Sequence, residues 1–166
     1  MALVKYNNNS LSAVTSTAGM PGGTMVLIKE QTASSSSTIS FVHGSSDVVL
    51  DSTYPIYLFK FINIHPATDQ KKFMFQGTTN GSDFNTTMTT TWFQAYHDEA
   101  DSNTALTYVV GEDQAQGTSF QSLSEDTGND NDQNYCGELW LYNPSSTTFV
   151  KHFIARAANY RSNDFI

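Results

Sequence analysis

The chain has 166 residues, enough for one domain, and its acidic residues outnumber its basic residues 16 to 8. This balance argues against nucleic acid as a partner, because phosphate binding needs clustered Lys and Arg and only Lys71 and Lys72 are adjacent. The single cysteine, Cys136, excludes an internal disulfide and a Cys-based zinc site. No apolar run approaches the roughly 18 residues of a membrane span, so no membrane partner is expected.

Residues 1–23 are mostly polar or turn-forming, with isolated apolar side chains between them. Such a segment buries too little surface to order itself, so it is either disordered or extended along a partner. The spacing favours an extended anchoring arm whose apolar side chains enter pockets on another subunit. The candidate partner-binding residues are Leu3, Val4, Leu11, Val14 and Met20.

The composition beyond the arm is rich in Ser, Thr and Asn, which is typical of an extracellular β-domain. The first ten residues nevertheless lack the apolar core, roughly 7–15 residues long, of a secretory signal. The combination predicts a component of a virus particle that is assembled in the host cytoplasm and exposed on the particle surface.

From Thr24 onward the pattern is that of short strands separated by turns, with no sustained helical period. The strongest strand, residues 54–64, is apolar on both faces except at Lys60, as in a strand covered on both sides. The pattern predicts an all-β fold, an antiparallel β-sandwich or jelly-roll-like domain over residues 24–166. The predicted strands cover 25–28, 38–42, 47–50, 54–64, 72–76, 88–96, 104–110, 139–142 and 147–155.

Three candidate chemical sites each have a plainer interpretation. Asp126, Asp130 and Asp132 could supply oxygens to Ca²⁺, but their spacing is not that of an EF-hand, and a solvated acidic loop is favoured. His97, which precedes several carboxylates, is favoured as part of a turn over a metal ligand or base. Cys136 is favoured as a small buried side chain. No catalytic residue and no cofactor are predicted.

Four aromatic residues could form a platform for sugar rings, with the alternative that they fill the interior of the domain. They are Trp92, Tyr96, Trp140 and Tyr142.

Several runs of the sequence carry a family signature: residues 23–41, 61–66 (Phe-Ile-Asn-Ile-His-Pro), 89–101, 128–132 and 143–153. They resemble a family of structural proteins from tailed bacteriophages of marine bacteria. The resemblance covers nearly the whole chain from Thr24. It implies a β-domain anchored by its N-terminus and displayed on the particle, with further strands beyond the position of Ile166 and no catalytic or metal residues.

The leading hypothesis is therefore a non-enzymatic virion component that binds capsid or tail proteins of the same particle. A head-decoration protein, assembled as a trimer or other homo-oligomer, is favoured over a tail-fibre module that binds host surface glycans. A free carbohydrate-binding module is the alternative from another class.

Overall fold

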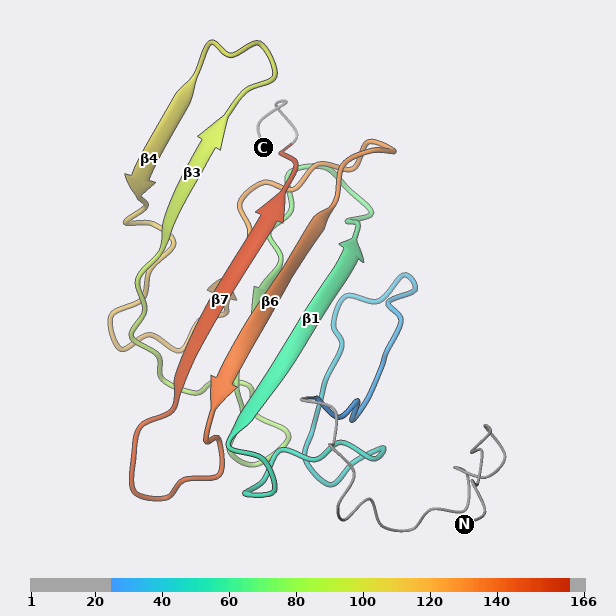
Figure 1. The fold of residues 1–166 in the computed structure, drawn as a ribbon, viewed down its shortest axis with the longest axis vertical. Coiled ribbons are helices and arrows are strands. Elements are labelled where there is room, and N and C mark those ends of the chain that lie inside the picture. The colour runs from blue at the N-terminus through green and yellow to red at the C-terminus, as the bar shows by residue number, and fades with distance from the viewer. Residues whose placement is uncertain (1–24, 162–166) are drawn as a thin grey trace, which may run out of the picture. The chain divides into compact units, whose positions relative to one another are not determined.

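The computed structural model describes residues 25–161, which form strands and no helix (Figure 1). The prediction of an all-β fold is thereby confirmed. The predicted anchoring arm, with its five partner-binding candidates, lies outside the described residues. The strands are β1 (Ile56–Ile64), β2 (Met74–Phe75), β3 (Phe93–His97), β4 (Thr104–Tyr108), β5 (Gln121–Ser122), β6 (Tyr135–Tyr142) and β7 (His152–Asn159).

The chain divides after Glu30, and the short described segment before this point is considered by itself. The predicted strand at 25–28 is wrong, because Met25–Glu30 contains no strand, and Met25, Val26 and Leu27 are all exposed. A run that is apolar on both faces becomes a strand only when other elements cover both faces.

An antiparallel sheet in the order β1-β6-β7 is the largest in the described chain (Figure 1). The register places Phe59 opposite Leu139, which lies opposite Ala155, and these three residues share the inner face. Leu58, Trp140 and Ile154 form the corresponding row of the other face, called here the outer sheet face. The predicted strand at 54–64 is confirmed almost to its ends.

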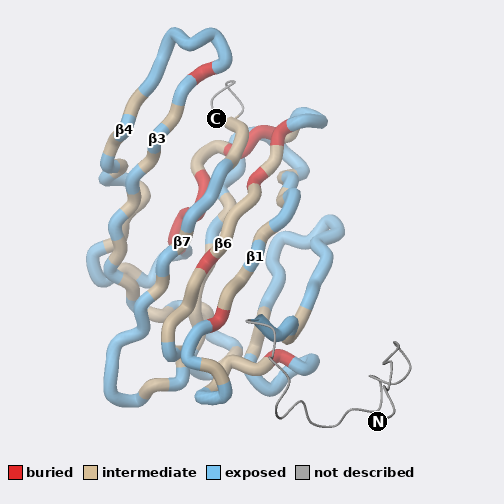
Figure 2. The backbone as a smooth tube through the Cα atoms, in the orientation of Figure 1, coloured by how far each residue is buried: buried red, intermediate tan, exposed pale blue. Residues whose placement is uncertain are grey.

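The core lies on the inner face of this sheet, where Tyr135, Leu139 and Leu123 are buried (Figure 2). The antiparallel pair β2–β5 belongs to this core, because Phe75 packs edge-on against Phe153 of β7 at a centroid distance of 4.8 Å. Phe73, Phe61, Ile64 and Leu141 complete the apolar layer. Each buried aromatic ring removes roughly 150–250 Å² from water, so a few rings supply most of the apolar burial.

Gly137 makes room for the largest side chain of the core. The Tyr135 ring is fully buried, and its centroid lies 4.8 Å from that of Phe73. A Cβ added at Gly137 would lie 2.7 Å from the Tyr135 hydroxyl and 2.8 Å from the carbonyl oxygen of Arg156. The glycine is therefore required by the close approach of the Tyr135 side chain and of the β7 backbone.

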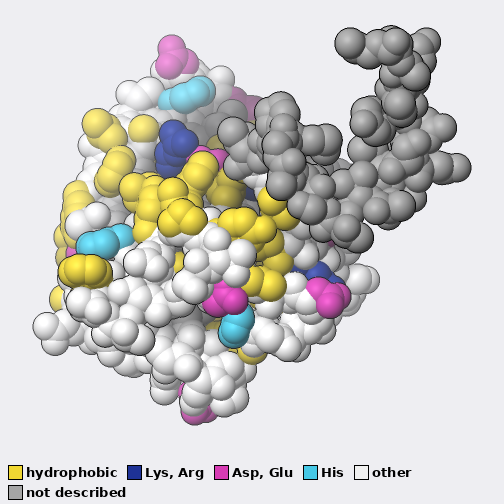
Figure 3. All heavy atoms as spheres, turned by 60° about the horizontal axis from the view of Figure 1, so that its bottom comes forward, with side chains coloured by type: hydrophobic (Ala, Val, Ile, Leu, Met, Phe, Trp, Pro, Cys, Tyr) yellow, Lys and Arg dark blue, Asp and Glu magenta, His cyan; other side chains and the backbone are white. Residues whose placement is uncertain are grey.

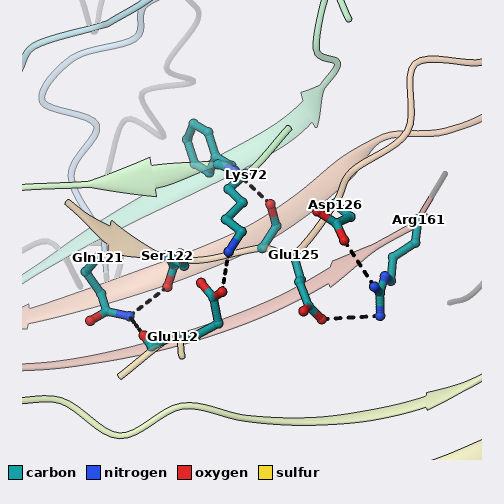
Figure 4. A network of polar contacts seen from close by, with 9 residues as sticks. Lys72, Glu112, Gln121, Ser122, Glu125, Asp126 and Arg161 are labelled. Carbon is teal, nitrogen blue, oxygen red and sulfur yellow. Dashed lines mark hydrogen bonds and ion pairs between the residues drawn. The ribbon is translucent and has the colours of Figure 1, made fainter. Parts of the chain in front are cut away.

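Strand β5 is polar yet buried, and hydrogen bonds compensate for its burial (Figure 4). The Gln121 amide donates to the carbonyl oxygens of Glu112, at 2.8 Å, and Ser122, at 3.0 Å. The backbone N–H of Phe73 donates to Ser124 Oγ at 2.8 Å. Near the end of the described chain, Arg161 forms ion pairs of 3.2 Å with Glu125 and with Asp126 (Figure 4).

Several predicted strands are shorter or displaced. Of the predicted strand 88–96, only the part from Phe93 onward forms, as β3. Met88 makes an isolated bridge to Gly117 instead of belonging to a strand. β6 begins four residues earlier than predicted and β7 five residues later. Residues 38–42 and 47–50 form no strand; Val48 instead closes a turn through bonds with Gly44 and Ser45.

The substitution Gly137→Ala should destabilise the domain by roughly 1–3 kcal/mol, because the added methyl group forces Tyr135 or the β7 backbone to move. Urea denaturation measures the change in the free energy of unfolding. Gly111→Ala is the matched control, because a Cβ at Gly111 meets nothing within 4 Å. Equal stability of the two variants would contradict this account of the core.

Candidate functional site

The outer sheet face is the candidate site. Its side chains form cross-strand rows in which β6 lies between β1 and β7 (Figure 1). From one end of the sheet the rows are Ile56–Tyr142–His152, Leu58–Trp140–Ile154 and Lys60–Glu138–Arg156, followed by Cys136 with Ala158. Successive rows on one face are roughly 7 Å apart. Two of the four predicted platform residues, Trp140 and Tyr142, therefore lie next to each other on this face.

Glu138 connects the aromatic row of this face to the charged row. Its carboxylate accepts a bond of 2.7 Å from the Arg156 guanidinium and a hydrogen bond from the Trp140 side chain. The bond from Trp140, followed by the bond and charge of Arg156, lowers the pKa of Glu138 below its usual value. The carboxylate therefore remains ionised at neutral pH and holds both neighbours in place.

Trp140 follows Glu138 by two residues on the same face of β6, so the two side chains are neighbours along the strand. Trp140 is half-buried, while Ile154 beside it is 55% exposed. Part of the Trp140 side chain is therefore accessible to solvent.

A shallow hollow lies at the charged row, on the side away from Trp140, where the side chains of β6 and β7 become small. Its lining includes the small or apolar residues Ile62, Cys136 and Ala158 and the charged residues Lys60, Glu138 and Arg156. Figure 3 shows hydrophobic side chains gathered in a patch, with Lys or Arg, Asp or Glu and His side chains beside it. The register gives the outer sheet face an apolar and aromatic row next to a row with two cations and one carboxylate.

Sequence reasoning missed the charged members of this site. The alternation of β1 and β6 places Lys60 and Glu138 on the outer faces of their strands. Their union with Arg156 in one row depends on β1 and β7 both pairing with β6, and no local sequence signal reports such pairing.

The other two predicted platform residues lie elsewhere, on the hairpin β3–β4 or beside it. Tyr96 belongs to the half-buried face of this hairpin, and Trp92 precedes β3 with the same alternation. The four rings therefore form two separate pairs rather than one platform. The opposite face of the hairpin is exposed and apolar, with Phe93 directly across from Tyr108 and Leu106 in the next row.

The tip of this hairpin is organised by Asp98, next to the His97 that the sequence singled out. The buried Asp98 carboxylate accepts bonds from the backbone N–H groups of Ser102, at 2.7 Å, and Asn103, at 3.1 Å, and from both of their side chains. These bonds lower the pKa of Asp98 below its ordinary value of 3.8. His97 is exposed, with its Nδ1 against the carbonyl oxygen of Asp98. The predicted turn forms at residues 98–101, whereas His97 itself is the last residue of β3.

The acidic candidates for Ca²⁺ are not brought together as ligands. Asp126 pairs with Arg161, whereas Asp130 and Asp132 are exposed. Across residues 25–161, no group of three or more His, Cys, Asp or Glu side chains is placed to hold a metal ion. Cys136 is half-buried, and its Sγ accepts a bond of 3.3 Å from the backbone N–H of Asn63.

Comparisons with known proteins add no identification: no protein-family profile, curated protein or solved structure matches the chain. The resemblance described above therefore stays a prediction. Within the described residues there is no helix of the length and apolarity needed to cross a bilayer.

Replacing Asp98 by Asn should loosen the hairpin tip, because the amide offers the Ser102 and Asn103 donors only one acceptor oxygen and no charge. Amide hydrogen exchange at Ser102 and Asn103 should become several-fold faster, while Asp101→Asn, on an exposed neighbour, leaves it unchanged. Hydrogen exchange at Ser102 and Asn103 that does not change when Asp98 is replaced would refute this role.

The lowered pKa of Asp98 also predicts a pH dependence in the native chain. The ionised Asp98 carboxylate stabilises the hairpin tip fully above about pH 3.8, and this stabilisation is lost as the pH falls further.

Proposed function

We propose that the protein is a non-enzymatic structural component of a virus particle, of the tailed-bacteriophage kind, and that it functions as an assembled homo-oligomer. In this proposal the strands form a jelly-roll-like sandwich exposed on the particle, and residues 1–23 anchor it to capsid or tail proteins. A decoration protein on the head is the favoured placement. The proposal is supported by the resemblance of the sequence and by the distribution of apolar side chains.

The observation that carries the proposal is the exposed apolar surface of the β3–β4 hairpin. Its half-buried face mixes Gln94 and Thr107 with Tyr96 and Ala105. Its exposed face carries Phe93, Leu106 and Tyr108. Phe93 and Leu106 are 71% and 77% exposed. Contiguous exposed apolar surface of this kind marks an interaction site.

Large apolar side chains are also exposed elsewhere in the described residues. Only five apolar or aromatic residues are buried there, whereas fifteen large hydrophobic residues are exposed. Single exposed apolar residues are normal on soluble proteins, so contiguity decides the matter. The hairpin pairs of β3 and β4 provide that contiguity, and a symmetric oligomer is the simplest assembly that covers the same patch on every subunit.

A second candidate function is favoured by the outer sheet face. Trp140 and Tyr142 lie side by side there, with Glu138 and His152 as polar neighbours, as a tail-fibre module or a free carbohydrate-binding domain would require. The two functions are compatible, because the outer sheet face and the hairpin involve different strands.

Assembly through the hairpin predicts that Phe93→Ser raises the dissociation constant of the oligomer roughly tenfold or more, because a buried aromatic anchor is lost from the interface. Sedimentation equilibrium measures this constant. Phe149→Ser is the matched control, because Phe149 is also 71% exposed but lies in the loop between β6 and β7. A native chain that stays monomeric at high concentration would contradict assembly through this face.

The place on the particle is tested by quantitative mass spectrometry of purified virions. Hundreds of copies per particle are expected for a decoration protein, and a few dozen or fewer would instead indicate a fibre. Deletion of residues 1–23 should leave a soluble domain that no longer joins the particle, as circular dichroism and co-sedimentation would report. Absence of the chain from purified particles would refute the virion proposal, and normal incorporation of the truncated chain would refute the anchoring role.

A further inference from the structure

We propose that the outer sheet face is a binding site for an acidic glycan, in which a sugar ring stacks on Trp140 while Lys60 and Arg156 bind the carboxylate of the glycan. The inference specifies the ligand class of the second function proposed above and does not depend on the virion role. It is carried by the position of the ring, the position of the charges and the hollow beside them.

The first step is the position of the indole. Trp140 lies between Leu58 and Ile154 in one row of the outer sheet face and is half-buried there. Apolar neighbours on both sides and a partly exposed aromatic ring suit a ligand that is itself flat and apolar on one side, as a pyranose ring is. Tyr142, in the next row, extends the aromatic surface along the strand.

The second step is charge. In a chain with twice as many acidic as basic residues, the outer sheet face reverses the ratio, with Lys60 and Arg156 on one row and a single carboxylate, Glu138, between them. That carboxylate is already bonded to Trp140 and Arg156. The Arg156 side chain remains 76% exposed, so donors of its guanidinium stay open to a ligand. The row carries net positive charge where the remainder of the chain would repel an anion.

The third step is spacing. The charged row is the immediate neighbour of the Trp140 row, roughly 7 Å away along β6. Lys60 and Arg156 border the shallow hollow over Cys136 and Ala158, where small side chains leave room for a substituent. A sugar stacked on Trp140 can therefore direct its carboxylate toward these cations. A charge-assisted, bidentate bond from Arg156 fits a carboxylate better than a hydroxyl group.

The test uses biotinylated oligogalacturonate as the acidic probe and its fully methyl-esterified form as the neutral one, with binding to the full chain measured by biolayer interferometry. The acidic probe should bind at least about tenfold more tightly than the ester, because only the acidic form offers carboxylates to Lys60 and Arg156. Equal affinity for the two probes would overturn the assignment to acidic glycans. No binding of either probe would overturn the site as proposed.

Variants then locate the binding. Trp140→Ala and Arg156→Gln should each weaken binding of the acidic probe roughly tenfold, because one removes the stacking surface and the other a charged donor. The matched controls, Trp92→Ala and Lys71→Gln, replace the same residue type or charge away from this face and should leave affinity unchanged. Affinity that survives both site variants would overturn the proposal.

A spectroscopic measurement covers the case in which Trp140→Ala fails to fold. The chain has two tryptophans, so Trp92→Phe leaves Trp140 as the only one. Adding oligogalacturonate should then change the Trp140 emission, and an unchanged spectrum at saturating probe would overturn stacking on this ring. Failure of these binding tests is distinguishable from failure of the virion proposal, which is judged by the presence of the chain in purified particles.

Discussion

The fold depends above all on the close contact between the Tyr135 side chain and Gly137 on the inner face of β6. The fully buried Tyr135 ring packs against Phe73 and Phe61, so it joins the segment leading into β2 to the sheet. Within the described residues its hydroxyl has no hydrogen-bond partner, and burial raises the Tyr135 pKa, so the group stays neutral. The ring area removed from water outweighs the desolvation of this one hydroxyl.

The small core limits how much apolar burial can stabilise the single subunit. Because few apolar side chains are buried in the described part, the domain has little apolar burial from which to gain stability. The exposed apolar face of the β3–β4 hairpin offers a second source, which becomes available only when another subunit covers Phe93 and Leu106. Stability and assembly are then coupled, because whatever binds the folded subunit shifts its unfolding equilibrium.

The sequence predicted the parts of the fold that have strong local alternation and missed the parts that depend on distant pairing. β1 and β4 were found because apolar and β-branched residues dominate them. β5 was missed because Gln121 and Ser122 are polar, and only hydrogen bonds made in the folded chain allow their burial. Trp140 and Tyr142 were named as a platform, but their separation from Trp92 and Tyr96 follows from strand order, which the sequence does not report.

The position of Glu138 explains how an acidic chain can present a locally cationic surface. A carboxylate beside Lys60 and Arg156 would ordinarily cancel part of their charge, yet Glu138 directs its bonds to Trp140 and Arg156 and so fixes both groups. In the proposed site a ligand would meet an aromatic ring and a guanidinium that share one carboxylate neighbour, which places the two groups side by side. Because these residues come from β6 and β7, and Lys60 from β1, the surface exists only when all three strands are paired.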